Sequence, residues 1–129
     1  MFTVKWAKNN GWEKPKIEPF GPISIPQTAT SLHYGISCFT DFSLFRNASS
    51  GKLNAFRVKD SFNDLNKASV CMDLPEVDEG EVMKLIKQLV KADGDWLPQS
   101  DALKNQLLLR IANYSVDHTG LGVRSAFFS

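Results

Sequence analysis

The chain has 129 residues, of which 43% are hydrophobic and 22% are charged, a composition that is ordinary for one globular domain. Its 15 basic and 14 acidic side chains give a formal net charge of +1, which provides no field to attract nucleic acid or an anionic membrane. Neither cysteine, Cys38 or Cys71, belongs to a zinc-binding motif, and no long apolar run occurs, so we expect a reduced, soluble, cytoplasmic protein.

The N-terminal part of the sequence predicts little regular structure. Thr3 to Trp6 suit a short strand, but four prolines then interrupt the chain: Pro15, Pro19, Pro22 and Pro26. Farther on, the segments Phe39 to Arg46 and Leu53 to Phe56 flank the turn-forming residues 47–52. Two strand-like segments around such a turn predict a β-hairpin.

Two helices are predicted after the hairpin, the first from about Asp60 to Met72. The second, from about Glu79 to Ala92, has apolar residues at three- and four-residue intervals: Val82, Leu85, Ile86, Leu89 and Val90. Asp78, with Glu81 three residues later, resembles a capping box, and we expect Gly94 to close the far end.

The last predicted elements are two strands, Leu107 to Tyr114 and Arg124 to Phe128, separated by a loop. Hairpins and helices in this order favour an α+β fold, with a mostly antiparallel sheet and two helices on one face. We expect residues 1–129 to form a single domain.

One segment carries a specific resemblance. Ser31 to Arg46 reads S-L-H-Y-G-I-S-C-F-T-D-F-S-L-F-R. It is similar to the active-site wall of branched-chain amino-acid aminotransferases, which are pyridoxal-phosphate enzymes of the D-alanine-aminotransferase fold type. The family has an acidic residue followed by glycine where this sequence has Thr40 and Asp41.

Shorter pieces extend the resemblance in the same order along most of the chain: Gly11 to Ile17, Gly21 to Ile25, Leu74-Pro75, Asp95 to Pro98, Leu107 to Arg110 and Leu121 to Val123. The resemblance implies the smaller N-terminal domain of the family. The large domain, with the lysine that binds the cofactor, has no counterpart in this sequence. We therefore expect the isolated chain to be catalytically inactive and to hold no pyridoxal phosphate, because that cofactor carries the chemistry of the family.

Three residues fall at substrate-pocket positions by resemblance: Tyr34, Phe39 and Arg110. Tyr34 and Phe39 could line an apolar pocket for a branched side chain, or they could be core aromatics. Arg110 matches an arginine that orders the substrate side of the pocket, although Leu108 replaces the family tyrosine and Ile111 the family proline. The alternative for Arg110 is a surface or interface ion pair.

Asp64 falls where the family has the arginine that grips the cofactor phosphate. A unit-charge pair about 4 Å apart contributes roughly 4 kcal/mol at an effective dielectric of about 20. Replacing that attraction with repulsion would lower cofactor affinity on the order of a thousandfold or more. The alternative role for Asp64 is a solvated position on a helix.

Other residues carry weaker expectations. The resemblance implies that Leu121, Gly122 and Val123 belong to a loop between domains that reaches toward a partner subunit. His33 and His118 lack the neighbours that a catalytic triad or metal site requires, so we expect no catalytic residue and no metal, and His33 would satisfy a hydrogen bond in its turn.

These observations leave three functional hypotheses. The first is a diverged, truncated aminotransferase-like protein, a pseudoenzyme that is inactive by itself. The second is a fragment that supports transamination of leucine, isoleucine or valine with 2-oxoglutarate when a large domain completes it. The third is an interaction module that self-associates or pairs with a full-length aminotransferase.

Overall fold

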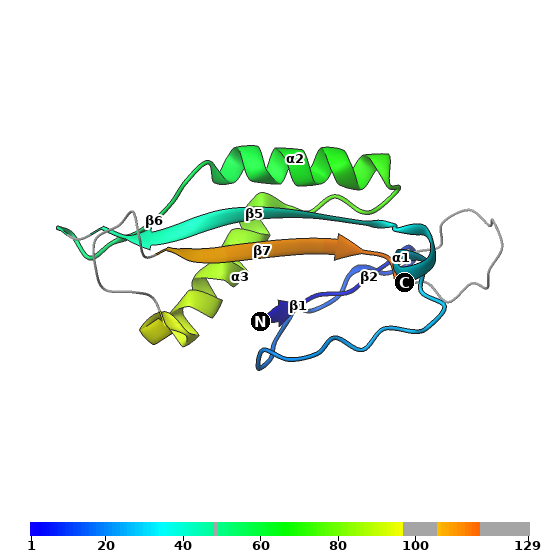
Figure 1. Ribbon diagram of the computed structural model, residues 1–129, viewed down its shortest axis with the longest axis horizontal. Coiled ribbons are helices and arrows are strands. Elements are labelled where there is room, and N and C mark those ends of the chain that lie inside the picture. Colours follow the sequence, from blue (N-terminus) through cyan, green and yellow to red (C-terminus); the bar gives the residue numbers. More distant parts are fainter. Residues whose placement is uncertain (48, 97–105, 117–129) are drawn as a thin grey trace.

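A three-stranded antiparallel sheet with the order β6-β5-β7 is the central element of the computed structural model, which describes residues 1–47, 49–96 and 106–116 (Figure 1). The middle strand, β5 (Ser37–Arg46), pairs at its end with β6 (Leu53–Ala55). β7 (Leu107–Tyr114) pairs with β5 from Ser37 opposite Tyr114 to Leu44 opposite Leu107. The predicted hairpin and the predicted strand at 107–114 are confirmed, whereas the strand predicted at 124–128 lies outside the described residues.

One face of this sheet is apolar because successive side chains in a strand point to opposite sides. The covered face carries alternate residues of β5 and β7: Phe42, Leu44, Leu107, Leu109 and Ile111. Helix α2 (Val58–Cys71) packs here through Phe62, whose ring centroid lies 6.3 Å from that of Phe42. Helix α3 (Glu79–Ala92) packs here through Val82 and Ile86. The predicted α+β class, with two helices on one face, is confirmed.

The two helices differ in direction. α2 runs alongside β5, whereas α3 crosses the strands obliquely (Figure 1). α2 begins two residues before the predicted start. Its N-cap residue, Arg57, adopts a left-handed conformation, and the Arg57 Nε donates to Asp60 Oδ2 at 2.6 Å. This ion pair between exposed side chains spans the first turn of the helix.

α3 has the predicted bounds and the predicted start signal. The Asp78 carboxylate accepts a hydrogen bond of 2.8 Å from the Glu81 backbone N–H, as an N-cap residue should. The Glu81 carboxylate instead contacts Lys84 Nζ at 2.6 Å, so no reciprocal bond of a capping box forms there. The C-cap is Asp93, and Gly94 begins the 3-10 helix η1 (Gly94–Trp96), so the expected glycine cap is wrong by one residue.

Polar side chains join α2 to the segment that leads into α3. The Asn66 amide donates to the Val77 carbonyl and accepts from the Val77 N–H, both at 2.9 Å. Asn113 Nδ2, on β7, donates to the Pro75 carbonyl at 2.8 Å and to the buried Ser69 hydroxyl at 3.1 Å. These bonds satisfy groups that would be costly to leave unpaired.

The N-terminal segment forms two short ribbons instead of the single predicted strand. β1 (Phe2–Thr3) pairs with β4 (Lys16–Ile17), and β2 (Trp6–Ala7) pairs with β3 (Gly11–Trp12). A short helix, α1 (Thr30–Tyr34), then ends at Gly35, where a φ of +66° suits glycine, and β5 follows. Among the described residues, no helix has the length and apolar character needed to cross a membrane.

Candidate functional site

The second face of the sheet, opposite both long helices, presents exposed apolar side chains. We define the open face as Phe39, Asp41 and Ser43 of β5 with Leu108, Arg110 and Ala112 of β7. Phe39 is 60% exposed and Leu108 is 58% exposed. Large apolar side chains in adjacent strands leave a surface that a ligand or another protein segment could cover.

Arg110 is anchored at the centre of the open face. It lies directly opposite Asp41 in the strand register. Its Nε donates to Asp41 Oδ1 at 2.8 Å and its Nη2 donates to Oδ2 at 2.7 Å, a bidentate arrangement that fixes the plane of the guanidinium. The Arg110 Cζ lies 4.5 Å from the Phe39 ring centroid, which adds a cation–π contact.

This ion pair also changes the protonation equilibria of its partners. The side-chain hydrogen bond from Arg110 lowers the pKa of Asp41 below its ordinary value, although partial burial acts in the opposite direction. The same hydrogen bond raises the pKa of Arg110. Both groups are therefore charged at neutral pH, and the negative charge beside Arg110 is supplied by the chain itself.

The structure brings together two of the three predicted substrate-pocket residues, Phe39 and Arg110. Tyr34 ends α1 just before β5 and is 55% exposed, so neither predicted aromatic is a core residue. Asp41 was not predicted as a partner of Arg110. The sequence did mark Asp41 as unusual, because Thr40 and Asp41 stand where the family pattern has an acidic residue and glycine. Only the strand register, however, shows which side chain Asp41 faces.

Comparison with known proteins shows which proteins this chain is similar to. No family model matches the chain. The chain is 37% identical over 100 residues to the mouse cytosolic branched-chain-amino-acid aminotransferase. Those residues make up 78% of this chain and 26% of the relative. It is 36% identical over 99 residues to the Dictyostelium discoideum branched-chain-amino-acid aminotransferase (77% and 26%). It is 34% identical over 101 residues to a probable enzyme of this kind from Staphylococcus aureus (78% and 28%).

The chain is a homologue of branched-chain aminotransferases. Only the N-terminal part matches. The chain spans about a quarter of the length of these curated relatives. The resemblance seen in the sequence is thus confirmed. The match does not transfer the activity of the full-length relatives to this chain, because most of their length lies outside it.

At the position that the sequence resemblance assigns to the cofactor phosphate, this aminotransferase homologue carries a carboxylate, which does not fit a phosphate group. Asp64 lies on α2, and its side chain is 76% exposed, 3.8 Å from Lys67 Nζ. A carboxylate there repels a phosphate dianion, so this position offers no grip. The observed setting of Asp64 is that of a solvated helix residue.

The other sequence candidates serve no visible chemistry in the part of the chain that is described. His33 Nε2 lies 2.8 Å from the Gln27 carbonyl oxygen, a contact that ties α1 to the segment before it. No group of three or more His, Cys, Asp or Glu side chains in ranges 1–47, 49–96 and 106–116 could hold a metal ion. Leu121, Gly122, Val123 and His118 lie outside the described residues.

Proposed function

We propose that this chain is a branched-chain-aminotransferase-like small domain whose open face lines one side of an amino-acid pocket. The observation that carries the proposal is the placement of Phe39 and Leu108, both more than half exposed, on either side of the Arg110–Asp41 pair. Ligand pockets are mostly apolar with a few fixed polar groups, and this combination suits a branched aliphatic side chain.

The remaining walls of the pocket would come from protein outside this match. The curated relatives extend over roughly four times the matched length, since the match covers 26% to 28% of each. The open face supplies the apolar surface, and a second segment of the kind found in the relatives would cover it. Substrates of this assembly would be leucine, isoleucine or valine with 2-oxoglutarate.

By itself, we propose, the chain is not a catalyst and takes no pyridoxal phosphate. Asp64 opposes the cofactor phosphate, and the bidentate contact with Asp41 uses the guanidinium edge that would otherwise meet a ligand carboxylate. Like the mouse relative, which is named as cytosolic, the chain would act in the cytoplasm.

A chimera tests this proposal. The matched segment of the Staphylococcus aureus relative is replaced by the corresponding residues of this chain, and leucine-dependent glutamate formation from 2-oxoglutarate is measured. We expect a folded protein with little activity. Asp64→Arg in the chimera should restore part of the activity, because it returns a cation to the phosphate position.

Asn63→Arg is the matched control, because it adds the same charge at the neighbouring exposed position of α2. It should leave the chimera inactive. A folded chimera with full activity before any substitution, or equal rescue by both arginines, would overturn the assignment of Asp64. The isolated chain should remain inactive even with Asp64→Arg.

A second candidate function is protein interaction, which exposed aromatic residues outside the open face favour. Phe20 is 93% exposed, Trp96 is 81% exposed and Phe56 is 67% exposed. Such side chains are enriched in protein interfaces. The chain would then self-associate or pair with a full-length aminotransferase, with no role for nucleic acid or membrane.

A further inference from the structure

A hollow of about 350 Å³ lies on the other side of the sheet from the open face, between the hairpin end of the sheet and α3. Its apolar walls are Leu44, Leu53, Met83, Ile86 and Val90. This volume is near the lower limit of small-molecule pockets, which is about 300 Å³. The hollow therefore has room for a small aliphatic ligand.

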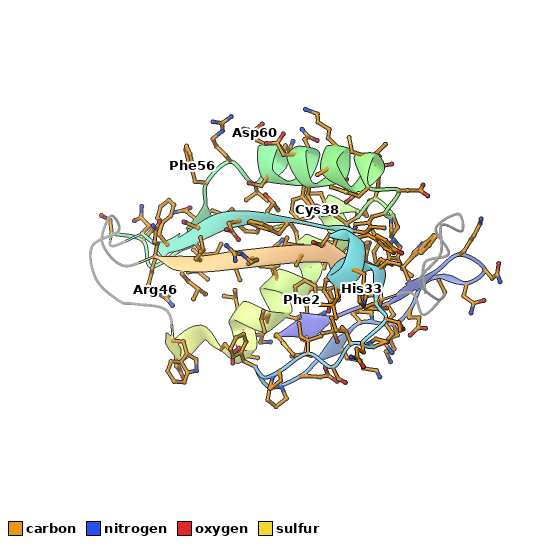
Figure 2. All side chains as sticks on the ribbon, turned by 45° about the vertical axis from the view of Figure 1, so that its right-hand side comes forward. Phe2, His33, Cys38, Arg46, Phe56 and Asp60 are labelled. Carbon is orange, nitrogen blue, oxygen red and sulfur yellow. The ribbon has the colours of Figure 1, made fainter. Side chains whose placement is uncertain are left out.

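Three basic residues also line the hollow. These are Arg46, Lys87 and Lys91, and no acidic residue is among the lining residues in the described part of the chain. Arg46 lies at the end of the sheet opposite His33 and Cys38 (Figure 2). Its Nη1 donates to the Gly51 carbonyl at 3.1 Å, whereas its buried Nε has no hydrogen-bond partner among residues 1–47, 49–96 and 106–116.

The two lysines strengthen the case for an anion. Lys87 and Lys91 are exposed residues of α3 separated by one helical turn. Like charges at this spacing repel each other and destabilise a helix. An anion held between these lysines and Arg46 would relieve the repulsion while its apolar part fills the hollow.

We propose that this hollow binds an aliphatic monocarboxylate, with the hydrocarbon chain against Leu44, Met83 and Ile86 and the carboxylate at the basic rim. The basic residues favour the negative charge of the ligand, and the apolar walls favour its hydrocarbon chain. The site is independent of the proposed pocket on the open face, because the residues of the two sites point to opposite sides of the sheet.

Calorimetric titration of the whole chain with three eight-carbon compounds tests the charge requirement. Octanoate should bind saturably, octan-1-ol at least about tenfold more weakly, and octylammonium not at all. Hexanoate should bind about fourfold more weakly than heptanoate, since about 0.8 kcal/mol per buried methylene corresponds to that factor. Equal binding of octanoate and octan-1-ol would overturn the proposal, as would the absence of saturable binding.

Methionine methyl resonances show where octanoate binds. The chain has three methionines, Met1, Met72 and Met83, of which only Met83 lines the hollow. With labelled methyl groups, octanoate should shift the Met83 signal and leave that of Met72 unchanged. A saturating shift of Met72 without one of Met83 would place the ligand elsewhere and overturn the assignment.

Two variants complete the test. Lys87→Gln with Lys91→Gln should weaken octanoate binding about tenfold or more. The affinities for octanoate and octan-1-ol should then differ less than they do in the wild type. Lys14→Gln with Lys59→Gln, both exposed and outside the hollow, removes the same total charge and should leave the affinity unchanged. Equal losses in the two double variants would mean that net charge alone attracts the anion, which contradicts a defined site.

Discussion

The Asp41–Arg110 pair gives Arg110, a predicted site residue, a carboxylate partner within the chain itself. An exposed arginine on a sheet face is available to an anionic ligand, but here a carboxylate directly across the strands receives both of its hydrogen bonds. The side chains are 26% exposed for Asp41 and 59% exposed for Arg110. A ligand carboxylate would have to displace Asp41 before it could contact the same donors.

Asp41→Asn should make the free energy of unfolding less dependent on pH in the acid range. Because the folded pKa of Asp41 is lowered, its contribution to stability is present above the unfolded value of about 3.9 and is lost as the pH falls through the folded value. Urea unfolding should therefore show a larger difference between wild type and Asp41→Asn at pH 7 than well below pH 4.

Arg110→Gln provides the control for this prediction. In an Arg110→Gln background the partner of Asp41 is absent, so Asp41→Asn should have nearly the same effect at both pH values. A double-mutant cycle that gives no coupling at pH 7 would show that the pair does not stabilise the fold.

The residue contacts of the open face were only partly predictable. The sequence indicates that Arg110 needs an anionic partner, but Asp41 is 69 residues away along the chain, and many acidic residues are alternatives. Only the pairing of β5 with β7 selects one of them. Sequence patterns give the side of a strand on which a residue lies, and they do not give the residue across from it.

At the scale of elements, α3 is stabilised mainly by one apolar stripe. Ile86 is 2% exposed and packs against the covered face of the sheet, whereas Leu85, central to the predicted stripe, is only half-buried. Ile86→Ala should lower the free energy of unfolding by about 2–5 kcal/mol, against about 0.5 kcal/mol or less for the exposed Gln88→Ala. Similar urea midpoints for the two variants would contradict the packing of α3.

The link between α2 and α3 depends on the amide of Asn66. Asn66→Ala removes two hydrogen bonds and leaves the half-buried N–H and C=O of Val77 without that partner. We expect a loss of about 1–3 kcal/mol in the free energy of unfolding. Asn63→Ala, at an exposed position of the same helix, is the control and should cost much less.

Long periodic elements were predictable, and short ones were not. The apolar spacing of α3 and the mostly apolar segment of β7 each favour one structure over many residues, and their predicted bounds are correct. β1 to β4 have two residues each, and α1 has five. Elements of that length form because of their partners in the fold, and the local sequence carries too little information to predict them.

At the scale of the whole molecule, the two faces of the sheet differ in what covers them. The covered face holds the core together through α2 and α3. The open face keeps Phe39 and Leu108 in solvent, and β7 pairs with β5 alone among the described strands. An apolar face beside an edge strand favours contact with another protein chain.

We therefore expect the purified chain to self-associate through the open face, and Leu108→Lys to shift it toward monomer. In a contact between two copies, the substitution would bury a cation beside Arg110 of each copy, which is strongly unfavourable. It leaves the core intact, because Leu108 points away from α2 and α3. Light scattering over a wide concentration range measures the change in mass.

Phe20→Lys is the matched control, because it replaces a 93% exposed aromatic with the same cation at a position outside the sheet. It should leave the association unchanged if the open face is the interface. Equal dissociation by both variants would attribute the association to general charge or hydrophobicity. A wild-type chain that stays monomeric at every concentration would remove self-association from the proposal and leave the open face to a different protein, the large segment found in the relatives.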